Sequence, residues 1–184
     1  MVSAVRYLVE LGHRRIGFVA KEPEHKDIAE RLMGYRESFG PLGLDYDASV
    51  ESIDQPRGYR GPRVPEPSPP VMDELVDPLL KLAAPPTALI VPSDWQSIGV
   101  YRALAGRGVR IPDDVCVIGF DNEEHICHSL VPTLTSLEYP AEEIGRQAVR
   151  MLVRRMKEGN GERQDTLLVK SVLVVRGSTG RPNL

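Results

Sequence analysis

The sequence has no apolar run that approaches the roughly 18 residues needed for a membrane-spanning helix. It contains only two cysteines, Cys116 and Cys127, which are too few for the disulfide framework of a small secreted domain. The first residues also lack an apolar core followed by a small-residue cleavage site, so they do not indicate an export signal. We therefore expect a cytoplasmic protein with reduced cysteines and no membrane partner.

Neither sign of charge dominates the chain. The 26 acidic and 23 basic residues are interleaved and give a formal net charge of -3, so no broad basic surface is available for nucleic acid. We therefore expect that this chain does not bind DNA by itself. Hydrophobic residues make up 41% of the 184 residues, which is enough to build the core of one domain or slightly more.

The motifs of common catalytic sites are also missing. The sequence contains no GxxxxGK[ST], GxGxxG, HExxH or GxSxG pattern, and no serine or cysteine stands beside a histidine at a recognisable nucleophile elbow. These absences favour a binding protein over an enzyme. We expect no cofactor.

Helix and strand patterns alternate along the chain. Apolar spacing predicts helices over 4–11, 28–42, 72–82, 95–105 and 141–157, and strands over 15–20, 50–53, 87–91, 115–120, 134–139 and 167–175. Residues 55–70 contain six prolines and two glycines, which predicts a loop. Because strands alternate with helices across short connections, we predict an α/β fold: a parallel sheet covered by helices on both faces.

The stretch VCVIGFDN, residues 115–122, reads as a buried strand that ends in a carboxylate and an amide. Ligands of open α/β sheets bind beyond the carboxyl ends of the strands, where loops converge and helix amino termini present free N–H groups. Asp121 is therefore a candidate acceptor for a ligand hydroxyl or ring N–H, and an exposed turn residue is the alternative. Asp94 lies on the same rim; we interpret it as the cap of the helix that starts at Trp95, and ligand contact is the alternative. Ser93 stays open between capping and ligand contact.

Other polar residues allow both a functional and a structural interpretation. The five-donor fork of Arg31 suits a ligand carboxylate or sugar hydroxyl, although most helix arginines are simply solvated. Trp95 suits either stacking on a sugar or packing in the core. His125, Cys127 and His128 match no zinc signature and have no second pair of ligands, so we predict an ordinary surface loop and no metal site.

Several long stretches resemble, in order and spacing, the effector-binding core of the lactose-repressor/galactose-repressor (LacI/GalR) family. They are YLVELGHRRIGFVA (7–20), RLMGYRESFGPLGLDYD (31–47), PPTALIVPSDWQSIGVYRALAGRGVRIPDDVCVIGFDN (85–122) and VPTLTSLEYPAEEIGRQAVRMLV (131–153), continuing to VVRGST. The resemblance covers nearly the whole chain except residues 52–72. It departs at Gly58-Tyr59, where the stacking aromatic that usually precedes this pair is missing, and at 60–70, which looks like an insertion or a remodelled loop.

The resemblance implies the small-molecule sensing core of a transcription factor. Such proteins dimerise, close on a small effector, here sugar-like or nucleobase-like, and act on operator DNA through an amino-terminal helix-turn-helix and hinge. The resemblance implies effector contacts from Asp121 and Arg31. Ser93 stands where many members have asparagine, and His25 where some members carry a second polar contact. A solute-binding protein of a transport system is the alternative from another class.

The same analogy suggests how the chain divides between two lobes of the periplasmic-binding-protein type. Residues 1–12 would be a helix of the amino-terminal lobe, 13–137 the carboxyl-terminal effector-binding lobe, 138–172 a helix and strand returning to the amino-terminal lobe, and 173–184 the closing strand and tail. The expected fold is a three-layer parallel-sheet lobe with orphan elements of the second lobe. The helix-turn-helix, the hinge and most of the amino-terminal lobe would lie outside the chain.

This division has a consequence for two of the predicted helices. Their apolar faces, which include Val5, Leu8, Ile144, Met151 and Leu152, would lack a sheet to cover them. Uncovered apolar surfaces favour association. We therefore predict a homodimer or larger assembly in which these helices are buried.

Overall fold

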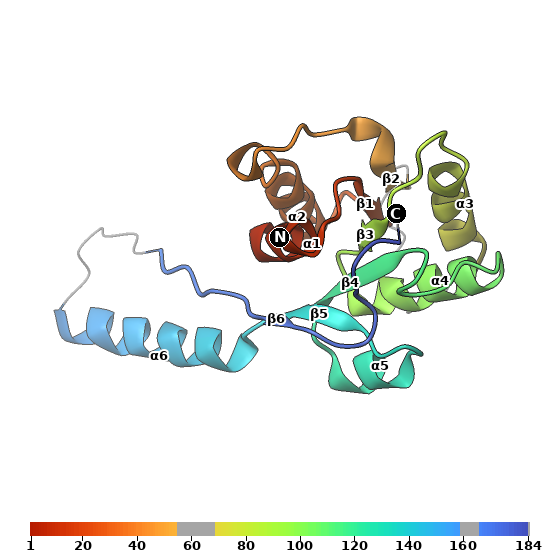
Figure 1. Ribbon diagram of the computed structural model, residues 1–184. Helices are drawn as coiled ribbons and strands as arrows, with labels where there is room; N and C mark the ends of the chain where they lie inside the picture. The colour runs from red at the N-terminus through yellow and green to blue at the C-terminus, as the bar shows by residue number, and fades with distance from the viewer. Residues whose placement is uncertain (55–68, 159–165, 184) are drawn as a thin grey trace.

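The computed structural model describes residues 1–54, 69–158 and 166–183 (Figure 1). Its strands form one sheet in the order β2-β1-β3-β4-β5-β6, with every neighbouring pair parallel except the antiparallel pair β5-β6. The strands are β1 Ile16–Ala20, β2 Glu51–Ile53, β3 Ala88–Ile90, β4 Cys116–Asp121, β5 Thr135–Glu138 and β6 Leu173–Val174. The helices are α1 Val2–Leu11, α2 Lys26–Arg36, α3 Pro69–Leu80, α4 Asp94–Ala105, α5 Glu124–Ser129 and α6 Ala141–Glu158.

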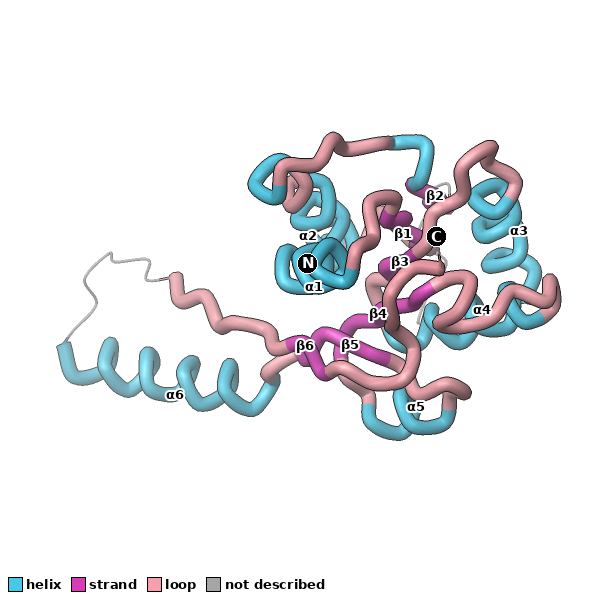
Figure 2. Tube along the Cα trace, in the orientation of Figure 1, coloured by secondary structure: helices cyan, strands magenta, loops and turns pink. Residues whose placement is uncertain are grey.

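Helices cover both faces of the sheet. Figure 2 shows α1 and α2 on one side of the strands and α3 and α4 on the other. Successive residues of a strand point to opposite faces, so Phe18 packs with α1 and α2 while Val19 packs with α3 and α4. Ile118 and Val117 divide in the same way. The predicted three-layer α/β architecture is confirmed.

Helix α1 is part of this layered core. Gly12 ends it in the left-handed conformation with φ 108°. Val5 and Leu8 are fully buried in the cluster that also contains Ile16 and Phe18. The expectation that their apolar face lacks a sheet is therefore wrong, because helical spacing shows which face is apolar and not which sheet it meets.

Two predicted elements are shorter than expected by more than two residues. Helix α2 ends at Arg36, and the chain then turns so that Phe39 packs edge-on against Tyr35, with ring centroids 5.0 Å apart. The strand predicted over 167–175 forms only at Leu173–Val174, where it pairs with β5. The end of α2 is set by the packing of the Phe39 ring, and the extent of β6 is set by its pairing with β5. The proline-rich residues 55–68, including Gly58-Tyr59, lie outside the described part of the chain.

Helix α6 and the segment that returns from it extend away from the layered body (Figure 1). Its apolar stripe is largely uncovered, with Leu152 59% and Met156 77% exposed, whereas Ile144 and Met151 are half-buried. The first turn of α6 is acidic and the last turn is basic, which suits the helix dipole. No helix within 1–54, 69–158 and 166–183 is long and apolar enough to cross a membrane.

Candidate functional site at the carboxyl edge of the sheet

The strands β1, β3 and β4 end at one edge of the sheet, which we call the carboxyl edge. Within the sheet, β2 lies next to β1 on one side, and the following strand, β3, lies next to β1 on the other side. Such a reversal of strand order sends neighbouring connections to opposite faces and leaves a crevice between them. The side chains that follow β1, β3 and β4 are therefore the candidate site.

Arg31 and Asp121 meet at the carboxyl edge. Nη2 of Arg31 donates to Oδ1 of Asp121 at 3.1 Å, and Nη1 donates to the backbone carbonyl of Pro92. The guanidinium carbon lies 3.8 Å from the centroid of the Phe120 ring, which adds a cation–π contact. Arg31 is thus held by the segment after β3 and by the end of β4. The two residues from which the family resemblance implies effector contacts therefore lie together beside parallel strands.

Burial governs the charge of this pair. The side chains of Arg31 and Asp121 are only 15% and 26% exposed. Burial raises the pKa of Asp121 to about 6, the Arg31 charge opposes the rise, and the nearby carboxylates of Asp94 and Glu123 add to it. At pH 7 the carboxylate is largely ionised and only partly hydrated. A ligand hydroxyl or N–H that replaces the remaining water can therefore bind it with a charge-assisted hydrogen bond.

The backbone that carries Asp121 is unusual. Asp121 and Asn122 have φ values of 109° and 57°, a region that residues with side chains rarely adopt. The backbone N–H of Asn122 donates to Ser136 Oγ at 3.1 Å, and its side-chain oxygen accepts from Arg176 at 2.7 Å. These contacts hold the turn that points Asp121 toward Arg31.

Asp94 lies beneath this turn, fully buried. Its carboxylate accepts hydrogen bonds from Ser136 Oγ at 2.7 Å, from the backbone N–H of Glu123 at 2.8 Å and from Cys127 Sγ at 3.4 Å. Burial raises its pKa. The interpretation of Asp94 as a helix cap is wrong: Ser93 is the cap residue, without a side-chain cap bond, and the carboxylate of Asp94 turns into the sheet.

Three other candidates lie on loops and helix starts at the same edge. Ser93 is half-buried, and Trp95 is 54% exposed with its ring centroid 6.2 Å from that of His125. His25 precedes α2, with Nε2 3.7 Å from a carboxylate oxygen of Glu22. Among the described residues, no hydrogen bond or ring contact joins Ser93, Trp95 or His25 to the Arg31–Asp121 pair. Their roles in binding stay predictions.

The histidine and cysteine cluster near residue 127 is helical, so the predicted surface loop is wrong. His125, Cys127 and His128 lie in α5, and Cys127 is buried next to Asp94. Burial and the Asp94 charge raise the pKa of Cys127 to about 12, so the thiol stays protonated. Across the described ranges, no group of three or more His, Cys, Asp and Glu residues is arranged to hold a metal ion.

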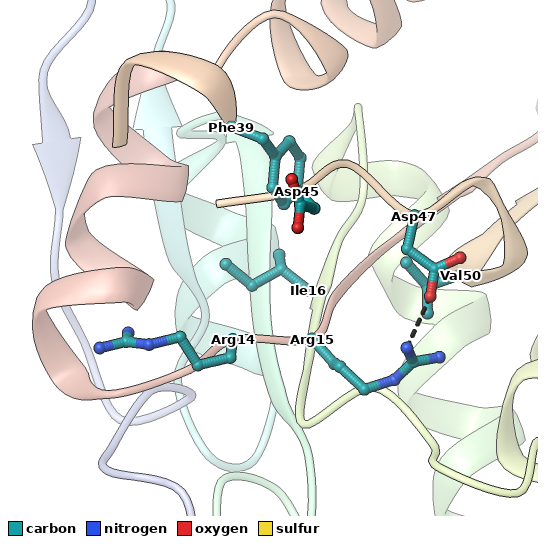
Figure 3. A pocket seen from close by; sticks show the side chains of 7 residues that line it. All are labelled: Arg14, Arg15, Ile16, Phe39, Asp45, Asp47 and Val50. Atoms are coloured by element: carbon teal, nitrogen blue, oxygen red, sulfur yellow. Dashed lines mark hydrogen bonds and ion pairs between the residues drawn. The ribbon is translucent and has the colours of Figure 1, made fainter. Parts of the chain in front are cut away.

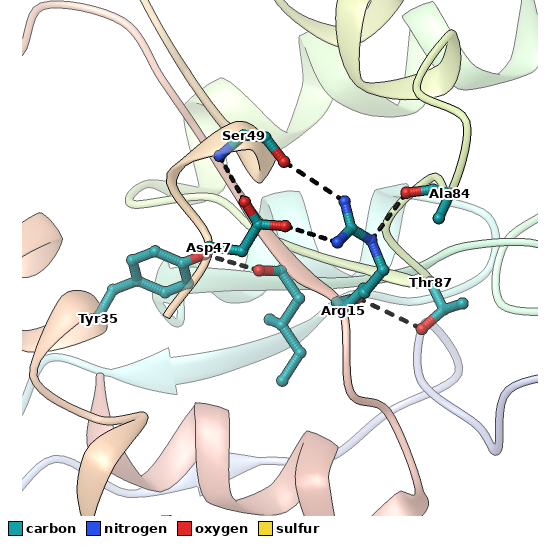
Figure 4. A network of polar contacts seen from close by, with 7 residues as sticks. Arg15, Tyr35, Asp47, Ser49, Ala84 and Thr87 are labelled. Atoms are coloured by element: carbon teal, nitrogen blue, oxygen red, sulfur yellow. Dashed lines mark hydrogen bonds and ion pairs between the residues drawn. The ribbon is translucent and has the colours of Figure 1, made fainter. Parts of the chain in front are cut away.

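A separate hollow of about 240 Å³ lies at the opposite, amino edge of the sheet (Figure 3). It is lined by Arg14, Arg15, Ile16, Phe39, Asp45, Asp47 and Val50. Arg15 is already occupied there: it donates to Asp47 at 2.5 Å, to the Ala84 carbonyl at 2.8 Å and to Ser49 at 3.5 Å (Figure 4). This network joins the loops before β1, β2 and β3, and we assign it a structural role.

Residues 5–179 match the family model of the periplasmic binding protein-like domain. The chain belongs to this family. The HTH-type transcriptional repressor CytR of Escherichia coli strain K12 is 34% identical over 180 residues, which cover 96% of this chain and 48% of the repressor. The periplasmic-binding-protein-like chain thus spans about half the length of the curated relatives it matches.

Solved structures agree with this assignment. A sugar-binding transcriptional regulator of the LacI family from Escherichia coli, complexed with phosphate, aligns over 98% of this chain and 60% of its own with TM-score 0.78 and 28% identity. A complex of the transcriptional regulator CelR with cellobiose aligns over 94% of this chain and 49% of its own with TM-score 0.71 and 31% identity. The resemblance of this periplasmic-binding-protein-like domain to the LacI/GalR family is confirmed.

Sequence reasoning missed several residues that shape this site in the periplasmic-binding-protein-like domain. The ring of Phe120 under Arg31 was not anticipated, nor was the bond from Arg176 to Asn122. Arg176 lies inside the family-like segment VVRGST, but nothing in that segment shows which loop it contacts. The Asp-Asn pair at 121–122 was a usable signal, because Asp and Asn adopt left-handed backbone more readily than most residues.

Proposed function

We propose that this domain is the small-molecule sensing part of a LacI-type transcriptional regulator. The observation that carries the proposal is the Arg31–Asp121 pair at the carboxyl edge of the sheet, one strand away from the point between β1 and β3 where the strand order reverses. The names of the relatives support it, because they are transcriptional regulators and not enzymes. Operator DNA would be bound by a segment other than the residues described here, and the regulator would act in the cytoplasm.

The ligand we propose is a small polyhydroxylated or nucleobase-like compound. Arg31 provides several N–H donors and Asp121 provides an acceptor, which together match hydroxyl groups or the polar edge of a heterocycle. Trp95 at the same edge offers an aromatic face for a sugar ring. The similarity to a regulator bound to cellobiose supports the sugar class. A transport solute-binding protein would use similar contacts, but the relatives named above favour regulation.

A screen with the 184-residue chain tests this proposal. Thermal unfolding is followed with millimolar monosaccharides, disaccharides, nucleosides and purines, and a ligand that binds the folded chain will raise its Tm. We expect Asp121→Asn to weaken binding of that ligand about tenfold or more, since a neutral amide loses the charge-assisted bond. Asp47→Asn, at the amino edge, is the control and should keep it. An unchanged response in Asp121→Asn excludes this site.

We further propose that α6 packs against a second copy of the chain. Its exposed apolar residues, which include Val149, Leu152, Val153 and Met156, form a stripe along one helix, and its acidic first turn complements its basic last turn in an antiparallel pair. Light scattering should therefore show a dimer or larger species that dissociates in Leu152→Glu. A clean monomer at high concentration contradicts this arrangement.

A further inference from the structure

The turn that carries Asp121 is held from two sides by residues distant in sequence. From below, Asp94 accepts from the backbone N–H of Glu123 at 2.8 Å and from Ser136 Oγ at 2.7 Å. The same Ser136 oxygen accepts from the backbone N–H of Asn122 at 3.1 Å. Asp94 and Ser136 therefore bind the backbone immediately after Asp121.

From the side, Arg176 holds the same turn. Its Nη2 donates to Asn122 Oδ1 at 2.7 Å, its Nη1 donates to the Leu134 carbonyl at 2.9 Å, and its backbone N–H donates to Thr135 Oγ1 at 2.8 Å. Leu134 and Thr135 lie at the start of β5. Arg176 thus bridges β5 and the loop after β4 from the segment that follows β6.

We propose that Asp94 and Arg176 are positioning residues that hold the left-handed Asp121–Asn122 turn and so keep the Asp121 carboxylate aimed at Arg31. Neither residue needs to touch a ligand for this role. This proposal rests on the proposed function in one respect: it takes the Asp121 carboxylate to be the acceptor for the ligand. Through Arg176, the carboxyl-terminal tail would thus help to position the ligand acceptor at the carboxyl edge.

Arg176 is not needed simply to dock the tail, because other bonds do that. Ser178 donates through Oγ to the Val117 carbonyl at 2.6 Å and accepts from the Thr135 N–H at 2.8 Å. Further along, the Gly180 carbonyl lies 2.9 Å from Nε2 of His13. Ser178→Ala is therefore a matched control, since it weakens tail docking without touching the contact to Asn122.

The pKa of Asp121 in the ligand-free chain reports whether the turn is held. The charged groups that act on it are Arg31, Asp94 and Glu123, and burial is the main reason that it stands near 6. A loosened turn lets water reach the carboxylate, which lowers its pKa. Separation from Arg31 acts in the opposite direction, but burial is the largest cause of the shift, so the pKa moves toward the ordinary value of about 4. If Arg176 had a purely structural role, replacing it would lower the stability of the fold and leave the pKa of Asp121 unchanged.

The experiment is a carboxyl carbon NMR titration of Asp121 in the full chain. We expect Arg176→Gln to lower its pKa by about one unit or more, whereas Ser178→Ala leaves it unchanged. Ser136→Ala should lower the Asp121 pKa in the same way, because it removes the oxygen that accepts from the Asn122 N–H and leaves the Asp94 side chain in place. Arg176→Lys, which keeps a cationic donor, should restore part of the shift. A pKa near 6 in both Arg176→Gln and Ser136→Ala overturns the proposal.

A second variant guards against misfolding of Arg176→Gln. Asn122→Gly removes the partner of Arg176 and tolerates the φ of 57° at that position. It should lower the Asp121 pKa as Arg176→Gln does, and the double variant should add nothing further. Additive shifts would overturn the proposed contact. The titration uses no ligand. A failed ligand screen would therefore overturn the proposed function, and the titration would still decide whether Arg176 and Asp94 hold the turn.

Discussion

Gly119→Ala is expected to lower the free energy of unfolding by about 3 kcal/mol or more. A Cβ at this position would stand 2.1 Å from Asp94 Oδ1 and 2.9 Å from Leu134 Cδ2. Asp94 cannot move aside cheaply, because three donors hold its buried carboxylate in place. Displacing it would leave those donors unpaired in the core, and that loss adds to the steric cost.

Denaturant unfolding followed by circular dichroism measures this effect. Gly145→Ala is the control, because Gly145 lies on exposed α6 and a Cβ there meets nothing within 4 Å. It should leave the midpoint unchanged or raise it slightly, since alanine favours helix more than glycine by about 1 kcal/mol. A Gly119→Ala chain that unfolds at the wild-type midpoint would show that Asp94 is not packed against Gly119.

Arg31→Ala is expected to have the largest effect on ligand binding. It removes the donors that we propose contact the ligand and also the positive charge that favours the ionised form of Asp121. We expect affinity for a ligand found in the screen to fall about a hundredfold, because a bidentate charge-assisted contact contributes about 3 kcal/mol. Isothermal titration measures the change. Arg107→Ala, which removes an exposed pairing with Asp73 and Asp77, is the control and should bind normally.

The stability of Arg31→Ala should depend on pH in a defined direction. The folded pKa of Asp121 is raised to about 6, so its contribution to stability is full below the unfolded value and is lost as pH rises through 6. Without Arg31 the folded pKa rises further. The deficit of Arg31→Ala relative to wild type should therefore be about 2 kcal/mol at pH 8 and shrink toward pH 4. A stability deficit that does not change with pH would show that Arg31 does not stabilise the charged form of Asp121.

The carboxyl edge and the place of Asp121 at it were predictable from the strand pattern, whereas the role of Arg31 beside it came from the resemblance to the LacI/GalR family. Arg31 follows one apolar strand and Asp121 ends another, and parallel strands place their carboxyl ends together. The location of Asp94 was not predictable, because helix-cap preference is a local rule and tertiary packing overrode it. The place of α1 on the sheet escaped prediction for a similar reason: its spacing marks an apolar face without identifying what covers it.

The contacts that support the turn depend on residues far apart in the chain. Arg176 and Asn122 are separated by 54 positions, and Asp94 and Ser136 by 42. No local pattern links such pairs, and each becomes visible only when β4 and β5 are paired and the tail is laid across them. The fold class and the candidate binding edge therefore follow from sequence, whereas the contacts that position the Asp121 carboxylate require the structure.

A backbone and side-chain NMR map of ligand binding tests the central claim most directly. The 184-residue chain, labelled with nitrogen-15, is titrated with the ligand identified by thermal shift. We predict that the largest shift changes fall on the amides of Asp121 and Asn122 and on the guanidinium of Arg31, with Arg14 and Asp45 unaffected. Changes confined to the amino-edge hollow, with Arg31 and Asp121 silent, would contradict the assignment of the binding site.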